Sequence, residues 1–331
     1  MINVLDYLVE GYFLKTVNGL IFEVKGVVHP QDRIIAYLRY VPQFNSIGLI
    51  SGYQKIYDLS EREKYLKKKF PQYLWFSETH QRILQAVPHE EVDQIFDPVK
   101  HMNQIRKETS VLSVATSNLV DVLLEYTEID KMQIGVTGSQ LIGVARETSD
   151  IDLIVFGESV CHEFYNKLRE KYSEIPGITC YDGDYLKDHV RFRWGSLVEY
   201  QDILSKIESE KKLQGLFENH HFFIRLVKKP QDISERYGQI VSDNSSLKEV
   251  QCLITEDQDS IFTPCVYQVE SSKFPSLTRI VSFRGRFTEH VSSGDSVNAK
   301  GRLENVTDTS TNERYQQLVV GERSSDYLIP R

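Results

Sequence analysis

Residue types that could do chemistry gather between positions 136 and 153. An apolar segment ends in Gly138 and Ser139, and after ten further residues a second apolar segment carries Asp150 and Asp152. Side chains alternate along a strand, so both aspartates would point to the same side, where their like charges repel. A magnesium ion prefers hard oxygen ligands and accepts substrate phosphates at its remaining positions, so this spacing predicts a site for one.

The glycine-serine turn supplies groups that bind anions. Gly138 has no side chain, so the backbone there can approach a ligand closely. The Ser139 hydroxyl and nearby N–H groups can donate hydrogen bonds to phosphate oxygens. Taken alone, the turn would more often be a helix cap and the aspartates part of an exposed turn. Together they predict phosphoryl or nucleotidyl transfer.

The run Val136-Thr137-Gly138-Ser139, followed after ten residues by Asp150-Ile151-Asp152-Leu153, resembles the signature of the DNA polymerase β-type nucleotidyltransferase superfamily. The central region is similar, in particular, to the archaeal-type predicted nucleotidyltransferases. The resemblance implies a short mixed sheet backed by helices. It also implies transfer of a nucleoside monophosphate from an NTP such as ATP to an acceptor hydroxyl, with two metal ions, Mg²⁺ or Mn²⁺.

The resemblance also assigns roles to residues. Gly138 and Ser139 would hold the triphosphate, and Asp150 and Asp152 would be catalytic and coordinate the metals. The family adds a third carboxylate from a later strand, but the candidate strand HHFFIRLV (220–227) offers Arg225, which is expected to bind nucleotide instead. The acids that precede that strand are Asp182, Asp184, Asp188 and Glu199. Without a third acid, the alternative is a catalytically silent module that binds RNA or a protein.

The remaining sequence predicts an α+β protein with β-rich modules on both sides of this core. Asn18-Gly19 favours a tight hairpin, and residues 109–126 carry apolar residues at helical spacing. Short alternating runs after residue 248 indicate a β-barrel, which could bind oligonucleotides. The expected parts are a β-rich module (1–58), a helical connector (59–107), a nucleotidyltransferase-like core (108–230) and a C-terminal β-barrel-like module (231–331).

Two basic or histidine-containing segments could also contribute. RFRW (191–194) alternates as a strand does, so Arg191 and Arg193 would share one face, either in solvent or against a triphosphate. In His220-His221, neighbouring strand residues face opposite ways, so the pair is not expected to chelate a metal.

Bulk composition narrows the class of protein. The 331 residues carry a net charge of −8, which argues against a polycation that wraps nucleic acid. The four cysteines are isolated, so neither a zinc knuckle nor a disulfide framework is expected. The N-terminal segment lacks a signal pattern, and no apolar run approaches the roughly 20 residues of a membrane span. We expect a soluble, cytoplasmic protein with an NTP substrate and no membrane partner; RNA, a small molecule and a protein remain open as acceptors.

Overall fold

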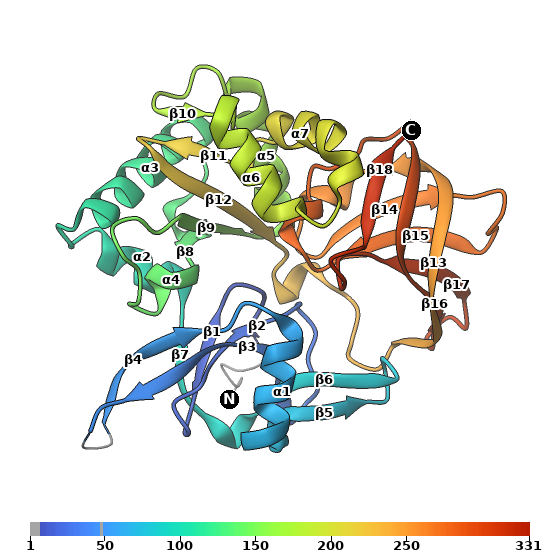
Figure 1. Cartoon of the computed structure of the whole chain (residues 1–331), viewed down its shortest axis with the longest axis horizontal. Coiled ribbons are helices and arrows are strands. Elements are labelled where there is room, and N and C mark those ends of the chain that lie inside the picture. Colours follow the sequence, from blue (N-terminus) through green and yellow to red (C-terminus); the bar gives the residue numbers. More distant parts are fainter. Residues whose placement is uncertain (1–6, 47–48) are drawn as a thin grey trace.

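The structure is a computed structural model that describes residues 7–46 and 49–331, and these form three β-sheets (Figure 1). In Figure 1 the N-terminal sheet, drawn in blue, lies below the central sheet, drawn in green and yellow, and the C-terminal strands, drawn in orange and red, lie to the right of both. The chain is therefore of the α+β class, with a central mixed sheet between two β-rich modules, as the sequence predicts.

The central sheet carries the predicted site residues. Its strand order is β10-β11-β12-β9-β8, with β9 and β12 parallel and the other pairs antiparallel. The strands are β8 (Ile134–Val136), β9 (Ile151–Phe156), β10 (Ile178–Thr179), β11 (Gln214–Phe217) and β12 (His220–Val227). Helices α3 (Val111–Thr127) and α5 (Glu158–Lys171) cover one face, while α4 (Gly138–Leu141) follows β8 directly.

Helix α3 shows how the sequence positions this layer. Ser110 caps its N-terminus by accepting a hydrogen bond from the Ser113 N–H at 3.2 Å, and Glu128 ends it in a left-handed conformation (φ 55°). Leu112, Leu119 and Leu123 recur at helical spacing and are buried against the sheet. The helix predicted for residues 109–126 is thus present with slightly shifted ends.

The N-terminal sheet is larger than the sequence indicated. It contains β1 (Phe13–Thr16), β2 (Ile21–Val24), β3 (Arg33–Phe44), β4 (Ile50–Lys55), β5 (Leu74–Ser77), β6 (Arg82–Pro88) and β7 (Val92–Phe96). Only α1 (Leu59–Lys69) and α2 (Pro98–Ile105) are helices of more than one turn in the segment 59–107. The helical connector was therefore wrong for residues 74–96, where β6 pairs with β3 and β7 with β1.

The C-terminal strands close into a barrel. They are β13 (Ile240–Glu256), β14 (Cys265–Glu270), β15 (Leu277–Ser282), β16 (Ser296–Asp308), β17 (Arg314–Val319) and β18 (Tyr327–Pro330). The order is β13-β14-β15-β17-β16, and the long strand β13 also pairs with β16, which closes the ring. Antiparallel pairing dominates, with one parallel contact between β15 and β17. The barrel predicted from alternating polarity is present in this part of the chain.

A helical pair connects the central sheet to the barrel. Helices α6 (Gly183–Trp194) and α7 (Gln201–Glu210) lie between β10 and β11 in the chain, beside the barrel in Figure 1. The strand expected at 191–194 was wrong, because Val190 and Trp194 lie one turn apart on α6 and are buried against barrel residues such as Phe287. No helix in the described part of the chain is long and apolar enough to cross a membrane.

Candidate active site

The glycine-serine turn and the aspartate strand meet at one edge of the central sheet. Gly138 begins α4 with a positive φ of +67°. A Cβ atom at this position would overlap the Asp152 carboxylate, so only glycine lets that side chain lie against the turn. The Thr137 N–H donates to the Asp152 carbonyl oxygen at 2.8 Å, which ties the turn to β9.

The two aspartates lie on the sheet face that the helices leave uncovered. Ile151 and Leu153 point into the core against α3 and α5, so Asp150 and Asp152 point the other way. Asp150 is exposed just before β9, and Asp152 is half-buried. Within residues 7–46 and 49–331, neither carboxylate has a hydrogen-bond or ion-pair partner.

The negative charge of Asp152 is not fully balanced by nearby positive charges. Burial raises its pKa above the usual value, and the charge of Asp150 raises it further, against the lowering effects of Arg225, Lys55 and Arg39. The ionised form therefore lacks sufficient compensation from the protein. Two adjacent carboxylates without protein partners fit the preference of a hard divalent cation for oxygen ligands.

Strand β12 supplies the neighbouring row of side chains but no acid. Phe223 is the register partner of Asp152, so His221, Phe223 and Arg225 share the face of the aspartates. The predicted third carboxylate is absent from this strand, as its sequence indicates. Asp182, Asp184 and Asp188 belong to the start and body of α6, and Glu199 follows it. Among the described residues, none of these acids forms a set of three close donor atoms with Asp150 and Asp152.

Arg225 belongs to a buried ionic cluster with the N-terminal module. Its Nη1 lies 2.9 Å from Glu10 Oε1 and 2.8 Å from Glu23 Oε1. Lys25 Nζ lies 2.6 Å and 2.9 Å from the same two oxygens, and Arg39 Nε lies 3.1 Å from Glu23 Oε2. Three cations thus face two buried carboxylates, and the cluster leaves one positive charge in the neighbourhood of Asp152.

The other modules complete the walls of the site. Tyr40 and Lys55 are register partners on β3 and β4, and Tyr40 packs against Leu141 at the end of α4. On the opposite side, the Arg193 guanidinium lies 5.4 Å from the ring centre of Phe223. Sequence reasoning missed Lys55, because nothing in a local pattern brings β4 to the aspartates.

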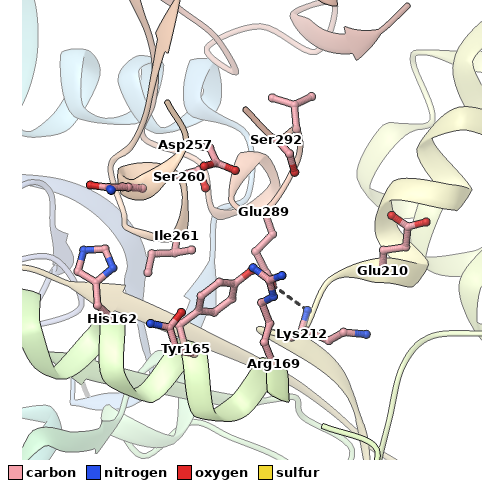
Figure 2. Close-up of a pocket in the computed structure, with 13 residues that line it drawn as sticks. His162, Tyr165, Arg169, Glu210, Lys212, Asp257, Ser260, Ile261, Glu289 and Ser292 are labelled. Atoms are coloured by element: carbon pink, nitrogen blue, oxygen red, sulfur yellow. Dashed lines mark hydrogen bonds between the residues drawn. The ribbon is translucent and has the colours of Figure 1, made fainter. Parts of the chain in front are cut away.

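A separate cavity of about 750 Å³ lies between α5 and the barrel (Figure 2). His162, Tyr165 and Arg169 enter it from α5, as Figure 2 shows, while Glu289 enters from the barrel side. The Glu289 carboxylate already accepts hydrogen bonds from the N–H groups of Lys212 at 2.9 Å and Leu213 at 3.0 Å. The cavity contains none of the predicted site residues, because α5 lies on the face of the sheet opposite the aspartates.

One further acidic group lies near this cavity. Glu158, His162 and Asp259 form the single set in the described ranges whose three donor atoms lie within 4.8 Å of one another. Lys228 Nζ contacts Glu158 and lies 3.1 Å from Asp259, so a cation of the protein itself already binds both carboxylates. We therefore assign no metal there.

Comparison with known proteins identifies a domain in the central part of the chain. The family model of the nucleotidyltransferase domain matches residues 117–217, a range that includes the glycine-serine turn and both aspartates. Residues 117–217 are a nucleotidyltransferase domain. The match ends just before β12, the strand that lacks the third acid. Such a domain implies an NTP substrate, and nucleotidyltransferase domains generally use divalent metals, so the match supports nucleotidyl transfer in general.

A relative of similar length aligns with nearly the whole chain. An uncharacterized protein of Methanocaldococcus jannaschii, MJ1086, is 27% identical over 323 residues, which cover 93% of this chain and 94% of the relative. No solved structure gave a significant match. The similarity thus extends over the flanking modules as well as the nucleotidyltransferase domain.

Replacing Gly138 by alanine should displace the Asp152 carboxylate and abolish metal-dependent nucleotide binding, because the new Cβ overlaps that carboxylate. Gly143→Ala is the matched control: Gly143 also has a positive φ, +70°, but a Cβ there meets nothing within 4 Å. Both variants should lose about 1 kcal/mol from backbone strain. Isothermal titration calorimetry measures the affinity of each variant for an Mn²⁺–nucleotide complex. Equal loss of affinity in both variants would contradict a specific role for Gly138.

Replacing Asp152 by asparagine should stabilise the metal-free protein at pH 7. The folded state raises the pKa of Asp152 above 3.8, so the ionised form opposes folding at neutral pH and a neutral isostere relieves that cost. We expect a gain of about 1 kcal/mol, seen as a rise of a few degrees in the unfolding midpoint. Mg²⁺ should raise the midpoint of the wild type but not of the variant. A lower midpoint for D152N without metal would refute the expectation.

Replacing Glu23 by glutamine should destabilise the protein by about 3–5 kcal/mol, because it leaves three partly buried cations with one buried carboxylate. Urea unfolding at pH 7 measures this loss. Burial would raise the pKa of Glu23, but Lys25, Arg39 and Arg225 outweigh it and hold the pKa well below 4.5. The stability that this charge contributes is therefore present above pH 4.5 and lost as the pH falls below it, a dependence that E23Q should lack.

The control for E23Q is Asp93→Asn, which breaks the exposed Lys15–Asp93 pair (3.2 Å) of the same sheet. An exposed pair contributes only about 0–1 kcal/mol. If the two variants lost similar amounts of unfolding free energy, the buried cluster would contribute no more to stability than an exposed ion pair.

Proposed function

We propose that this protein transfers a nucleoside monophosphate from an NTP such as ATP to an acceptor hydroxyl, with Mg²⁺ or Mn²⁺ bound at Asp150 and Asp152. The observation that carries the proposal is a pair of carboxylates inside the matched domain that lack partners among the described residues, with Asp152 lying against the Gly138 turn. A divalent ion there would neutralise phosphate charge and polarise the α-phosphorus for attack.

In the proposed complex, the triphosphate lies along the Gly138–Ser139 turn. The N–H groups at this turn and the Ser139 hydroxyl donate hydrogen bonds to phosphate oxygens, and the absence of a side chain at Gly138 allows the close approach. Asp150 and Asp152 hold the metal on the same side of the sheet. This arrangement brings the α-phosphorus to the exposed end of β9.

The cations around the site would balance the charge of the triphosphate. Lys55 has no ion-pair partner among the described residues, its ammonium lying 4.7 Å from the centre of the Tyr57 ring, so it is available to bind phosphate. The role we propose for Arg225 in nucleotide binding is electrostatic, since its Nη1 is held by Glu10 and Glu23. The N-terminal module is in this view part of the catalytic site.

The reaction forms one bond and breaks one. The acceptor oxygen bonds to the α-phosphorus, the bond from that phosphorus to the bridging oxygen of the β-phosphate breaks, and pyrophosphate leaves with the bonding electron pair. The acceptor hydroxyl loses its proton in the same step. The chain must therefore bind the triphosphate, orient the acceptor and receive that proton.

The second candidate is a silent module that binds nucleotide, RNA or a protein without turnover. The lack of an acid on β12 favours it, because the family uses a third carboxylate to deprotonate the acceptor. The two candidates differ in one measurable result: the silent module binds metal and nucleotide but labels nothing.

The test is to incubate the protein with each α-labelled NTP and Mg²⁺ or Mn²⁺ in the presence of total RNA, proteins and small hydroxyl compounds. We expect label in one acceptor class, and a loss of at least about 100-fold in the Asp150→Ala, Asp152→Ala double variant. The control replaces Asp184 and Asp188 on α6, which form ion pairs with their helix neighbours Lys187 and Arg191.

Two results would contradict the proposal. Labelling by the double variant at the wild-type rate would remove the aspartates from catalysis. Nucleotide binding by the wild type without transfer to any acceptor would favour the silent module.

A further inference from the structure

The side chain beside the aspartates on β12 is a histidine. Phe222 is the register partner of Ile151 in the parallel β9–β12 pair, so His221 lies one step earlier, level with Asp150. Side chains alternate along β12, and Phe222 points into the helix-covered core. His221 therefore points to the face of Asp150 and Asp152, on a strand about 4.8 Å away.

Two tyrosines contact the His221 ring and hold its orientation. Its Nδ1 lies 3.0 Å from the Tyr181 hydroxyl, and the Tyr185 ring meets it edge-on with centroids 5.8 Å apart. Tyr181 itself is buried and stacks on His189 at 4.1 Å. Residues 7–46 and 49–331 place no hydrogen-bond partner on His221 Nε2, so that atom is available to a ligand.

The support for Tyr181 extends into a buried polar network. His189 Nε2 lies 2.8 Å from Glu208 Oε2, and Glu208 also accepts hydrogen bonds from Trp194 Nε1 at 3.0 Å and Lys211 Nζ at 2.8 Å. Glu208 and Lys211 are almost completely buried. Such a network holds one arrangement of α6 against the sheet, and with it the position of Tyr181.

His221 does not lie where a third metal ligand would. In the described ranges, the single set of three donor atoms within 4.8 Å of one another is at Glu158, far from this face. Asp150, Asp152 and His221 therefore do not converge on one point. The spacing leaves room for another group, such as a hydroxyl, between the imidazole and a metal held by the aspartates.

We propose that His221 binds the acceptor hydroxyl through Nε2 and receives its proton, in the role that the missing third carboxylate would have. This inference rests on the proposed function. The Nδ1–H of the neutral ring donates to the Tyr181 oxygen, which leaves the Nε2 lone pair free to accept. As the acceptor oxygen bonds to the α-phosphorus and pyrophosphate departs, the hydroxyl proton moves to Nε2 and from there to solvent.

His221 is a catalytic residue in this account, because it touches the substrate, and Tyr181 is a positioning residue. His221→Gln should lower the transfer rate by about 100-fold or more, as for loss of a general base. Its affinities for Mn²⁺ and for NTP should stay within about twofold of the wild type, since neither contact is removed. His220→Gln is the matched control, because the adjacent strand residue points to the opposite face.

Two further variants separate chemistry from folding. His221→Ala should recover part of its transfer rate when imidazole is added, whereas the Asp150→Ala, Asp152→Ala double variant should not. Tyr181→Phe should slow transfer by about tenfold with unchanged NTP affinity, because the ring of His221 loses its orienting partner. Thermal unfolding of each variant confirms that it is folded.

The outcomes distinguish this inference from the proposed function. If the wild type transfers nucleotide and H221Q does so equally fast, His221 has no catalytic role and the inference fails alone. If H221Q loses Mn²⁺ binding together with activity, the histidine is a metal ligand and the inference also fails. If the wild type labels no acceptor, the proposed function fails and the inference falls with it.

Discussion

The structure depends on one constraint: two carboxylates are held on the same side of a largely buried strand without a protein partner. Repulsion between Asp150 and Asp152 opposes folding, and the turn at Gly138 brings the backbone close enough to enclose the second carboxylate. A fold keeps such an arrangement only if the rest of the molecule is stable enough to carry it. The helix-covered face of the central sheet, with its continuous apolar core, provides that stability.

The flanking modules adjust the electrostatics of this edge. The N-terminal sheet contributes two buried glutamates that hold Arg225, and it brings two more cations, Lys25 and Arg39, so the cluster retains a positive charge near Asp152. Helix α6 provides His189, which stacks on Tyr181, and the pair α6–α7 packs against the barrel. The candidate site therefore lies where the N-terminal module meets the central sheet.

The net negative charge of the chain restricts how it could bind an RNA acceptor. With a net charge of −8, the chain has no general attraction for a polyanion, so an RNA acceptor would have to be held by local contacts. The cations that line the site come from two modules, Arg39 and Lys55 from the N-terminal one and Arg193 and Arg225 from the core. Binding of a phosphate-rich substrate would thus draw on tertiary structure and not on any single basic segment, and the closed barrel by itself does not identify the acceptor.

The sequence by itself predicted that the turn at Gly138 and Ser139 and the two aspartates belong to one site, because their spacing is local and strand alternation sets the common side of Asp150 and Asp152. The resemblance of this segment to a known family implied the mixed sheet, while periodicity in the sequence indicated the helix over 109–126 and the barrel. Only the tertiary structure decided that residues 74–96 are strands and residues 191–194 helical, since pairing with β3 and β1 and packing on the barrel override short-range pattern. It alone placed Lys55 and His221 beside the aspartates, because contacts between distant strands depend on register, which no local spacing encodes.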